Sequence, residues 1–284
     1  MDQQDTTPSS SQLSISDHDF KQLGDLIYKQ FGIHLPDSKR TLLARRLRGL
    51  LKEHNFTFQK YYDYLVNHPS DVKFTELVNR ITTNYTFFNR EPDHFDFFTR
   101  TVLPELTRTR TAANDCDLRI WCAAASTGEE PYMLAMLMME YLGSSYMLWD
   151  AGVLATDLSK KALTKAVVGQ YKEKEFGSMP RHLLKKYFTL VGPGIYEVKR
   201  RLKQELTYRC FNLISPVYPF KQPFDVVFCR NVLIYFDKPT TAKVIHSLHA
   251  SLSPGGYLFI GHSESIKQHS QIFKYIMPAV YRKI

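Results

Sequence analysis

The chain has 284 residues, of which 44% are apolar and 23% charged, and its net charge is +9. This composition is typical of a globular protein with an anionic partner. It has no run of about 18 apolar residues, which argues against a membrane-spanning helix, and its polar start argues against a signal peptide. The four cysteines form no C-x-x-C pair. We therefore expect reduced thiols in the cytoplasm, with neither disulfides nor a zinc site.

The first part of the chain is predicted to be helical. Residues 1–16 are rich in Ser, Thr and Gln and are predicted to form a disordered tail. Residues 17–82 carry apolar side chains at helical spacing in four successive segments, and Gly32 ends the first of them. These residues are predicted to form a small helical domain.

The second of these helical segments is strongly basic. It opens at Pro36-Asp37-Ser38, and from Lys39 onward it contains no acidic residue before Glu53. Its cations are Lys39, Arg40, Arg45, Arg46, Arg48 and Lys52. Most charged runs are solvated faces, but six cations without an acid favour a docking surface for an acidic partner. Nucleic acid is one such partner, and an acidic helical protein is another.

From residue 118 onward, predicted strands and helices alternate. The strands are expected at 118–122, 151–155, 224–229, 256–260 and 280–282, and the helices at 130–142, 160–168 and 239–252. This pattern predicts an α/β domain over residues 83–284, with a mostly parallel, doubly wound sheet. Ligands of such sheets lie beyond the carboxyl ends of the strands.

One segment, at about residues 187–211, interrupts this alternation. It is predicted to contain strands at 187–191, 195–199 and 206–211, with a Gly192-Pro193-Gly194 turn after the first. We interpret it as a small antiparallel β-subdomain inserted in the α/β domain.

The first predicted strand leads into a loop of small residues. Ala124, Ser126 and Gly128 occupy alternate positions, so a ligand can approach the backbone at the start of the next helix. Glu129 and Glu130 then place two carboxylates on the first helical turn, where they stabilise the helix but would repel a pyrophosphate. The segment is either a tight turn with an acidic cap or a site for a cationic nucleoside such as S-adenosylmethionine.

Polar residues follow three further predicted strands. Asp157 ends the second strand, where an acid can accept hydrogen bonds from ribose hydroxyls or cap the next helix. Asn212 and Leu213 follow another strand, and Arg230-Asn231 follows the strand 224–229, with Tyr235 one helical turn later. Each is an ordinary loop residue alone, but their shared place at strand ends predicts one site.

Four stretches of the sequence carry a specific resemblance. They are Ala123–Tyr132 (AAASTGEEPY), Phe228–Phe236 (FCRNVLIYF), Thr83–Glu91 (TNYTFFNRE) and Gly261–Glu264 (GHSE). From about residue 17 to its end, the chain resembles the chemotaxis receptor glutamate methyltransferases, the CheR family.

The resemblance implies a four-helix N-terminal domain and a class I, Rossmann-like S-adenosyl-L-methionine methyltransferase domain with an inserted β-subdomain. It implies methyl transfer to glutamates of methyl-accepting chemotaxis receptors, giving γ-methyl esters and S-adenosyl-L-homocysteine. The basic helix, through Arg40, Arg45, Arg46 and Arg48, would dock on the receptor's methylation helices.

The resemblance also implies which residues form the site. Those expected at the cofactor are Asn84, Thr86, Arg90, Ala124, Glu129, Glu130, Asp157, Asn212, Leu213, Arg230 and Asn231. Tyr235 would line the reaction site together with Arg230 and Asn231.

A glutamate acceptor fixes the expected chemistry. Its carboxylate is ionised at neutral pH and needs no general base. We expect in-line displacement with no metal, covalent intermediate or catalytic cysteine. Arg90 is the first choice for the group that holds the attacking oxygen, as a planar two-pronged donor, and Tyr235 is the second.

Two other functions remain open on the sequence. The pI of about 9.2 suits a nucleic-acid methyltransferase, although Arg230-Asn231-Val232-Leu233 stands where base-methylating enzymes have Asn/Asp-Pro-Pro-aromatic. A non-catalytic module that senses the cofactor is the other.

The turn at residues 191–194 looks shorter than in the members of the resembled family whose β-subdomain grips a receptor's C-terminal pentapeptide. This difference argues against such a tether here.

Overall fold

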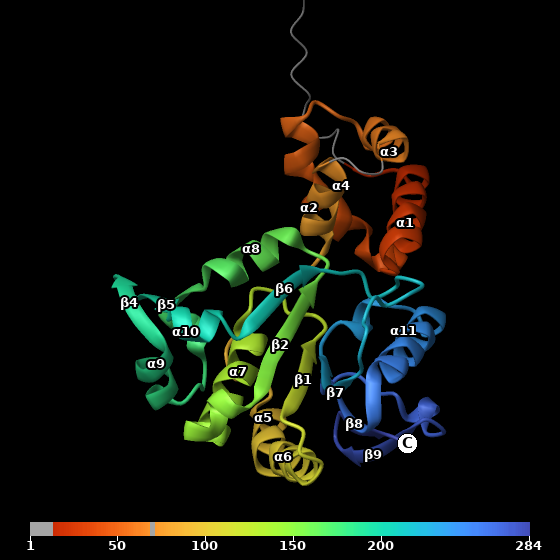
Figure 1. The fold of residues 1–284 in the computed structure, drawn as a ribbon. Coiled ribbons are helices and arrows are strands. Elements are labelled where there is room, and N and C mark those ends of the chain that lie inside the picture. Colours follow the sequence, from red (N-terminus) through yellow and green to blue (C-terminus); the bar gives the residue numbers. More distant parts are fainter. Residues whose placement is uncertain (1–13, 69–71) are drawn as a thin grey trace, which may run out of the picture. The chain divides into compact units, whose positions relative to one another are not determined.

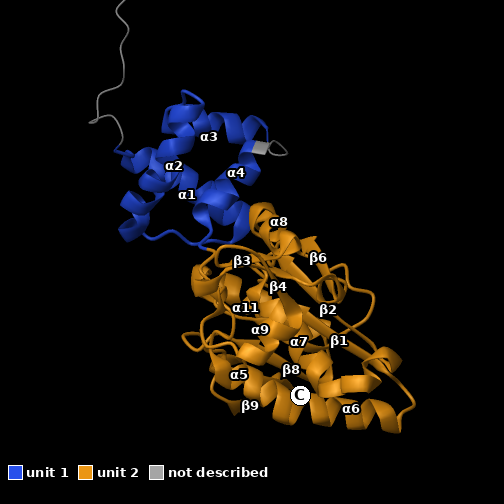
Figure 2. Ribbon diagram, turned by 90° about the vertical axis from the view of Figure 1, so that its left-hand side faces the viewer, with its two compact units in different colours: residues 1–83 blue, residues 84–284 orange. Residues whose placement is uncertain are grey.

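The computed structural model describes residues 14–68 and 72–284. The chain forms two compact units, residues 1–83 and residues 84–284 (Figure 2). The predicted tail at residues 1–16 lies mostly outside the described residues.

Unit 1 is an all-helical bundle. Its helices are α1 (Asp17–Phe31), α2 (Arg40–Glu53), α3 (Phe58–Asn67) and α4 (Val72–Ile81), with a 3-10 turn, η2 (Asp37–Lys39), before α2. The Ser16 hydroxyl accepts the N–H of Asp19 and caps α1, and Gly32 ends it with a φ of 70°. The predicted four-helix domain is confirmed.

Unit 2 is built on a seven-stranded sheet (Figure 1). Its strands, in spatial order, are β6 (Leu206–Cys210), β2 (Asp150–Asp157), β1 (Asp117–Cys122), β7 (Phe224–Cys229), β8 (Leu252–Ile260), β10 (Val280–Lys283) and β9 (Phe273–Met277). The first five run parallel, whereas β10 is antiparallel to both β8 and β9. The chain proceeds outward from β1 in one direction and from β7 in the other, so the crevice for a ligand lies where β1 and β7 end.

Helices cover both faces of this sheet. They are α5 (Pro92–Phe97), α6 (Leu103–Ala112), α7 (Glu129–Leu142), α8 (Lys160–Val168), α9 (Arg181–Tyr187), α10 (Arg200–Lys203) and α11 (Lys238–Ser251). The shorter turns are η3 (Phe98–Val102), η4 (Gly143–Leu148), η5 (Glu173–Phe176), η6 (Leu233–Tyr235) and η7 (Lys267–His269).

The alternation of side chains along β1 shows why both faces are apolar. Ile120 and Cys122 join the core formed with α5, η3 and α7, whereas Trp121 joins the core formed with α11. Successive side chains of a strand point to opposite faces, so a strand covered on both sides reads as a continuous apolar run. The predicted Rossmann-like α/β fold is confirmed.

The small antiparallel sheet differs in one strand from the sequence-based expectation. Its order is β3 (Gln170–Lys172), β5 (Ile195–Val198) and β4 (Phe188–Gly192). The expected third strand, β6, instead pairs in parallel with β2 at the edge of the large sheet. The sheet therefore closes with a strand from before the predicted insertion, because β3 offers β5 an antiparallel edge that a local strand pattern does not reveal.

Two further expectations concern membranes and thiols. Within the described residues, no helix combines the length and the apolar character that a bilayer span requires. The four cysteines are free thiols, with Cys122 and Cys229 buried and Cys116 and Cys210 exposed.

Candidate functional site

The loop between β1 and α7, residues 123–128, is held in one shape by its neighbours. Gly128 has a φ of 100°, and a Cβ built on it would lie 2.7 Å from the Tyr171 hydroxyl oxygen. That hydroxyl donates to the carbonyl of Thr127 at 2.6 Å. Only glycine fits this position, so the loop is a rigid turn that presents the start of α7 at the sheet edge.

Asp157, at the end of β2, ties this loop to the next one. Its Oδ2 accepts the Ser126 N–H and its Oδ1 accepts the Ser159 N–H, both at 2.8 Å. Burial raises the pKa of the Asp157 carboxyl, although these N–H groups oppose the shift. Each carboxylate oxygen has two lone pairs, so the acid can position the loop and still accept a hydrogen bond from a ligand.

The two adjacent glutamates at the start of α7 have different environments. Glu129 is fully buried, and both of its carboxylate oxygens accept the Thr127 hydroxyl, at 2.9 and 2.7 Å. Glu130 is partly exposed and lies against Arg230 and the Cys122 thiol. The Glu129 carboxylate therefore points into the protein, whereas that of Glu130 lies at this edge; that both meet the cofactor stays a prediction.

Arg230, which follows β7, forms a buried ion cluster with Glu91 and Glu130. Its Nη1 donates to Glu130 Oε2 at 2.5 Å, and its Nη2 lies 3.0 Å from Glu91 Oε2. Nη2 also donates to the carbonyl of Arg90. The Arg230 side chain is 1% exposed, so it supports the site through these buried contacts, and its expected place at the reaction site stays a prediction. Two carboxylates and one guanidinium leave a formal charge of −1 where β1 and β7 end.

Glu91 joins three separate segments. It precedes α5 with a φ of 57°, accepts the Asn231 amide at 3.2 Å and accepts the His262 N–H at 3.3 Å. Burial by itself would raise the pKa of the Glu91 carboxyl, but Arg230 and Asn231 outweigh it and the pKa is lowered. Glu91 therefore stays ionised and fixes the segment before α5 to the loops after β7 and β8.

Glu264 fixes the loop after β7 from the other side. Its carboxylate accepts the backbone N–H groups of Gly261, Asn231 and Ile234, at 2.5, 3.0 and 3.3 Å. Gly261 allows this approach, because a Cβ there would lie 2.4 Å from the Asn231 side-chain nitrogen. Asn231 itself has a φ of 57°. The strained turn that leads to Tyr235 is thus determined by Glu91 on one side and Glu264 on the other.

His94 and His262 lie beside this cluster. Donor atoms of Glu91, His94 and His262 come within 4.8 Å of one another, close enough to share a metal ion. However, the Glu91 carboxylate is already paired with the Arg230 guanidinium. That guanidinium would repel a metal cation bound beside it, since two like unit charges 4 Å apart repel by about 4 kcal/mol in a partly buried site. Burial, together with Arg230, lowers the pKa of His94 to about 3. We therefore treat these residues as part of the ion cluster's surroundings.

The connector, residues 84–91, carries three of the expected cofactor residues. The Asn84 carbonyl accepts the Ser126 hydroxyl at 3.3 Å, which places the connector against the loop 123–128. The Arg90 guanidinium donates to the Tyr85 carbonyl at 3.0 Å, and its Nε lies 4.0 Å from Glu91 Oε1. Thr86 and Arg90 are half-buried. An arginine has five N–H donors, so most of those on Arg90 remain available.

The remaining expected residues lie along the same sheet edge. Asn212 follows β6 and accepts the Ile214 N–H at 3.2 Å, next to the buried Leu213. Ala124 is half-buried in the loop after β1. Tyr235 ends η6 and is half-buried. Strand β6 neighbours β2, so Asn212 and Asp157 follow adjacent strands, as the strand-end rule predicts.

Two of the four arginines that are expected to dock on a receptor, all on the basic helix α2, have partners within unit 1. Arg40 pairs with Asp17 and Asp37, and Arg46 donates to the Ile81 carbonyl and the Thr83 hydroxyl. Arg45 and Arg48 are exposed. Arg40 and Arg46 therefore stabilise the bundle, whereas Arg45 and Arg48 face solvent, and docking through these four arginines stays a prediction.

Sequence reasoning assigned no role to Glu91, His94, His262 or Glu264. His262 and Glu264 follow β8 directly, so the strand-end rule that selected Arg230 would have included them. Glu91 lies just before α5 and His94 lies on it, and both precede β1 in the chain. Nothing in their local pattern indicates that they pack at a strand end.

Comparisons with known proteins cover both units. Residues 84–281 match the family model described as CheR methyltransferase, SAM binding domain, and residues 18–82 match CheR methyltransferase, all-alpha domain. A chemotaxis protein methyltransferase of Borreliella burgdorferi is 36% identical over 95% of this chain and 96% of its own length. Those of Escherichia coli and Salmonella typhimurium are 35% and 36% identical, each over 96% of this chain and over 93% and 92% of their own lengths.

Proposed function

We propose, from the premise that this chain belongs to the CheR methyltransferase family and binds S-adenosyl-L-methionine, that it methylates glutamate side chains of chemotaxis receptors. The product would be a γ-methyl ester on the receptor. The chain's similarity to chemotaxis protein methyltransferases, over nearly its whole length, supports a protein acceptor in that signalling system.

One observation carries the proposal at the level of the site: Glu91 and Glu130 share the single guanidinium of Arg230. The resulting formal charge of −1 suits a cofactor whose sulfonium and ammonium groups are cationic, and it would repel a pyrophosphate. Glu130, at the edge of the cluster, would meet the methionine end of the cofactor. Asp157 and Asn212 would meet the ribose and the adenine.

The bound cofactor supplies an electrophilic methyl group and leaves as S-adenosyl-L-homocysteine. The acceptor glutamate is ionised at neutral pH, so the protein has no proton to remove. An oxygen–carbon bond forms as the carbon–sulfur bond breaks, and the electron pair of that bond stays on sulfur. Both reacting charges disappear in this step. The protein therefore has to orient two oppositely charged groups, and catalysis comes mainly from positioning.

Arg90 and Tyr235 are the groups that we propose orient the acceptor. Both are half-buried, and both offer donors to a carboxylate oxygen: Arg90 as a fork and Tyr235 as a hydroxyl. Holding one carboxylate oxygen leaves the other free to attack. The connector and the loop after β7, which carry these two residues, are fixed to each other through Glu91.

A labelling experiment tests the function. The protein is incubated with methyl-labelled S-adenosyl-L-methionine and chemoreceptor-containing membranes, and in parallel with RNA. Mild alkali then releases the label from protein as methanol if it is a carboxyl ester. Label on RNA, alkali-stable label on protein, or no transfer to either acceptor would refute the proposal.

A further inference from the structure

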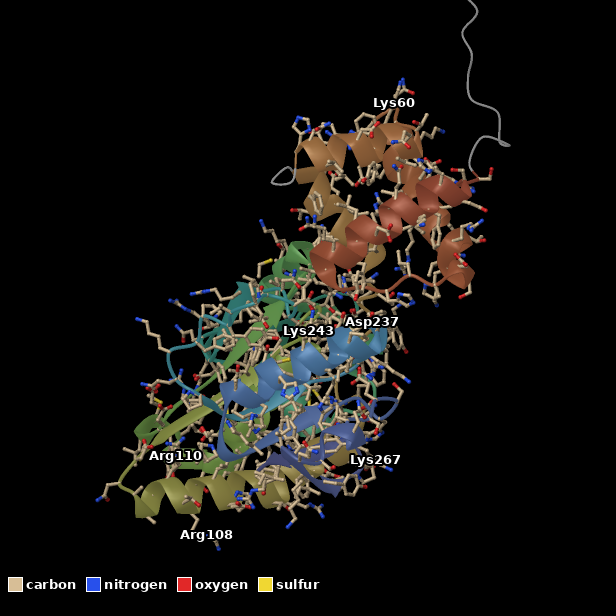
Figure 3. All side chains as sticks on the ribbon, turned by 90° about the vertical axis from the view of Figure 1, so that its right-hand side faces the viewer. Lys60, Arg108, Arg110, Asp237, Lys243 and Lys267 are labelled. Atoms are coloured by element: carbon tan, nitrogen blue, oxygen red, sulfur yellow. The ribbon has the colours of Figure 1, made fainter. Side chains whose placement is uncertain are left out.

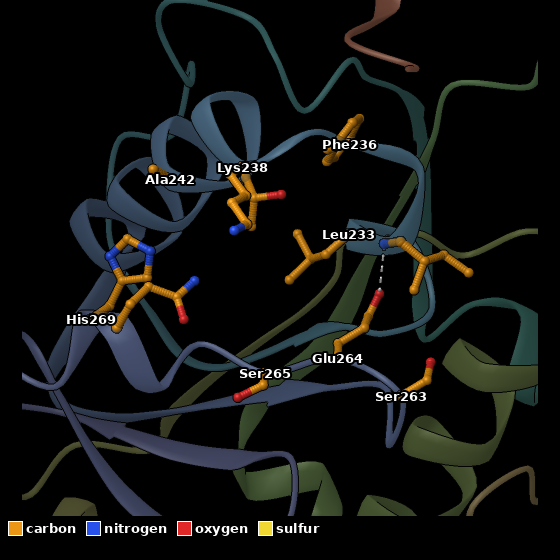
Figure 4. Close-up of a pocket in the computed structure, with 11 residues that line it drawn as sticks. Leu233, Phe236, Lys238, Ala242, Ser263, Glu264, Ser265 and His269 are labelled. Carbon is orange, nitrogen blue, oxygen red and sulfur yellow. Dashed lines mark hydrogen bonds between the residues drawn. The ribbon is translucent and has the colours of Figure 1, made fainter. Parts of the chain in front are cut away.

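A cavity of about 550 Å³ opens beside the loop that carries Tyr235. Its walls come from η6, from the first turns of α11 and from residues 263–269 after β8 (Figure 4). In Figure 4 the side chains of Leu233 and Lys238 point toward this space, which His269 bounds on one side and Glu264 on the other. The cavity therefore adjoins the loop that places Tyr235.

The chemistry of its walls is amphipathic. Leu233, Phe236 and Ala242 provide apolar surface, and Ile234 at the edge has 53% of its surface exposed to solvent. Lys238 is the exposed cation of the lining. An exposed isoleucine next to an apolar hollow is the kind of surface that buries a partner's side chain.

Among the described residues of the lining, the one carboxylate is that of Glu264, and backbone N–H groups of the protein engage it. Glu264 is 9% exposed, and its oxygens accept the N–H groups of Gly261, Asn231 and Ile234. Asp237, which precedes Lys238, accepts the Thr240 N–H as the cap of α11 and does not line the cavity. The cavity thus presents an exposed cation, Lys238, beside its apolar wall, and this pairing complements a partner that carries an acid next to an apolar residue.

The same wall also holds the reaction-site loop. Tyr235 lies between Ile234 and Phe236, which both line the cavity. Glu264 accepts the N–H of Asn231 and the N–H of Ile234. Its carboxylate therefore connects the cavity wall at Ile234 to the turn at Asn231. An occupant of the cavity would therefore contact the residues on either side of Tyr235.

We propose that this cavity binds the methyl-accepting protein itself, receiving an apolar side chain of the acceptor helix while Lys238 pairs with an acidic residue one turn away. The proposal rests on the proposed function and adds a recognition surface to it. Residues three or four apart lie about 5–6 Å from each other on one helix face, so one amphipathic helix can present both groups. Such helix-in-groove docking places the glutamate to be methylated in a defined register beside Tyr235.

Two substitutions with matched controls test this surface. Ile234→Asp puts a charge at the apolar edge, and its control is Val217→Asp at a 76% exposed valine of the same unit. Lys238→Glu reverses the rim charge, and its control is Lys243→Glu, an exposed lysine of the same helix that does not line the cavity. Figure 3 labels Lys243 on α11 and Asp237, the residue that caps this helix.

The measured quantities are KM for receptor membranes and the dissociation constant of S-adenosyl-L-homocysteine. We expect Ile234→Asp and Lys238→Glu each to raise the receptor KM by about tenfold or more, the scale of losing one well-buried interface contact. The dissociation constant should change by less than about twofold, which also shows that the variants fold. Both controls should keep the wild-type KM.

The outcomes separate this inference from the proposed function. If the wild-type protein forms receptor esters and both cavity variants keep the wild-type KM, the cavity does not recognise the acceptor. If the controls lose as much as the cavity variants, the effect is general charge and this inference fails as well. If the wild-type protein forms no ester on receptors, it is the proposed function that fails.

Discussion

The guanidinium of Arg230 and the carboxylate of Glu91 lie 3.0 Å apart, although 139 residues separate them in the chain. The pair joins the segment before α5 to the loop after β7 and is almost fully buried. Glu130 completes the cluster from the start of α7. The Arg230 guanidinium therefore helps to set the positions of Arg90, Asn231 and Tyr235 relative to one another.

Removing that guanidinium should destabilise unit 2 strongly. Arg230→Met would leave the partly buried carboxylates of Glu91 and Glu130 without their guanidinium, and we expect a loss of about 3–5 kcal/mol in the free energy of unfolding. Adding Glu91→Gln should cost less in the Arg230→Met background than in the wild type, because Glu91 has then already lost its guanidinium partner. Urea unfolding followed by tryptophan fluorescence measures this, since Trp121 and Trp149 both lie in unit 2. Strictly additive effects would show that the two residues are not coupled.

Arg90 is expected to act on turnover. With the acceptor saturating, Arg90→Ala should lower kcat by about 100-fold, the scale of losing one well-placed electrostatic contact. Arg90→Lys should retain an intermediate rate, because it keeps the charge and loses the planar fork. Arg100→Ala, at an exposed position on η3, is the matched control. Near wild-type turnover in Arg90→Ala would rule out the proposed role.

Asp157 is expected to act on cofactor affinity. Asp157→Ala removes the acceptor for the Ser126 N–H and the proposed acceptor for the ribose. We expect the dissociation constant of S-adenosyl-L-homocysteine to rise by about 10- to 100-fold, as for the loss of a hydrogen bond to a charged group. Titration calorimetry measures it, with Asp150→Ala, an exposed acid at the start of the same strand, as control. Equal affinity in the two variants would contradict this role.

His94 should make the stability depend on pH. Burial, with Arg230, lowers its pKa to about 3 from an ordinary 6.5. Between these values the unfolded chain binds a proton that the folded chain excludes, so stability falls as the pH drops through that window. The slope from this group is about 1.4 kcal/mol per pH unit.

The His94→Phe variant isolates this contribution. Phenylalanine suits the site, since the His94 ring packs edge-on against Phe259. The stability difference between wild type and variant should shift in the variant's favour as the pH falls from 6.5 to 4. His182→Phe, at an exposed histidine of unit 2, is the matched control. Parallel pH profiles for wild type and His94→Phe would mean that His94 takes up its proton at the same pH in the folded and the unfolded chain.

Gly261 should not tolerate a side chain. In Gly261→Ala the new Cβ would lie 2.4 Å from the Asn231 side-chain nitrogen and must displace that turn. We expect a loss of about 1–3 kcal/mol of stability, as for other overpacked sites, together with a lower kcat. Gly192→Ala is the control, because its Cβ would meet nothing closer than 3.9 Å. Wild-type stability and turnover in Gly261→Ala would show that the turn yields freely.

The local sequence determined the elements and the edge of the sheet that carries the site. Apolar runs such as Phe224–Cys229, buried at every residue, mark central strands of a parallel sheet. Caps at Ser16, Ser159 and Asp237 each accept a backbone N–H of the following helix. Such signals act over a few residues, so a single sequence displays them. The strand-end rule then brought Asp157, Asn212 and Asn231 to one edge.

Only the tertiary structure decided the partners of side chains far apart in the chain. Glu129 and Glu130 are adjacent and chemically identical, yet one is buried beneath Thr127 and the other faces Arg230. Likewise β6 joined the large sheet and β3 the small one. Strand pairing and the burial of charge depend on which distant groups complete the hydrogen bonds. The sequence therefore placed an acidic turn at the edge where β1 ends, and the fold selected which of its two carboxylates remains there.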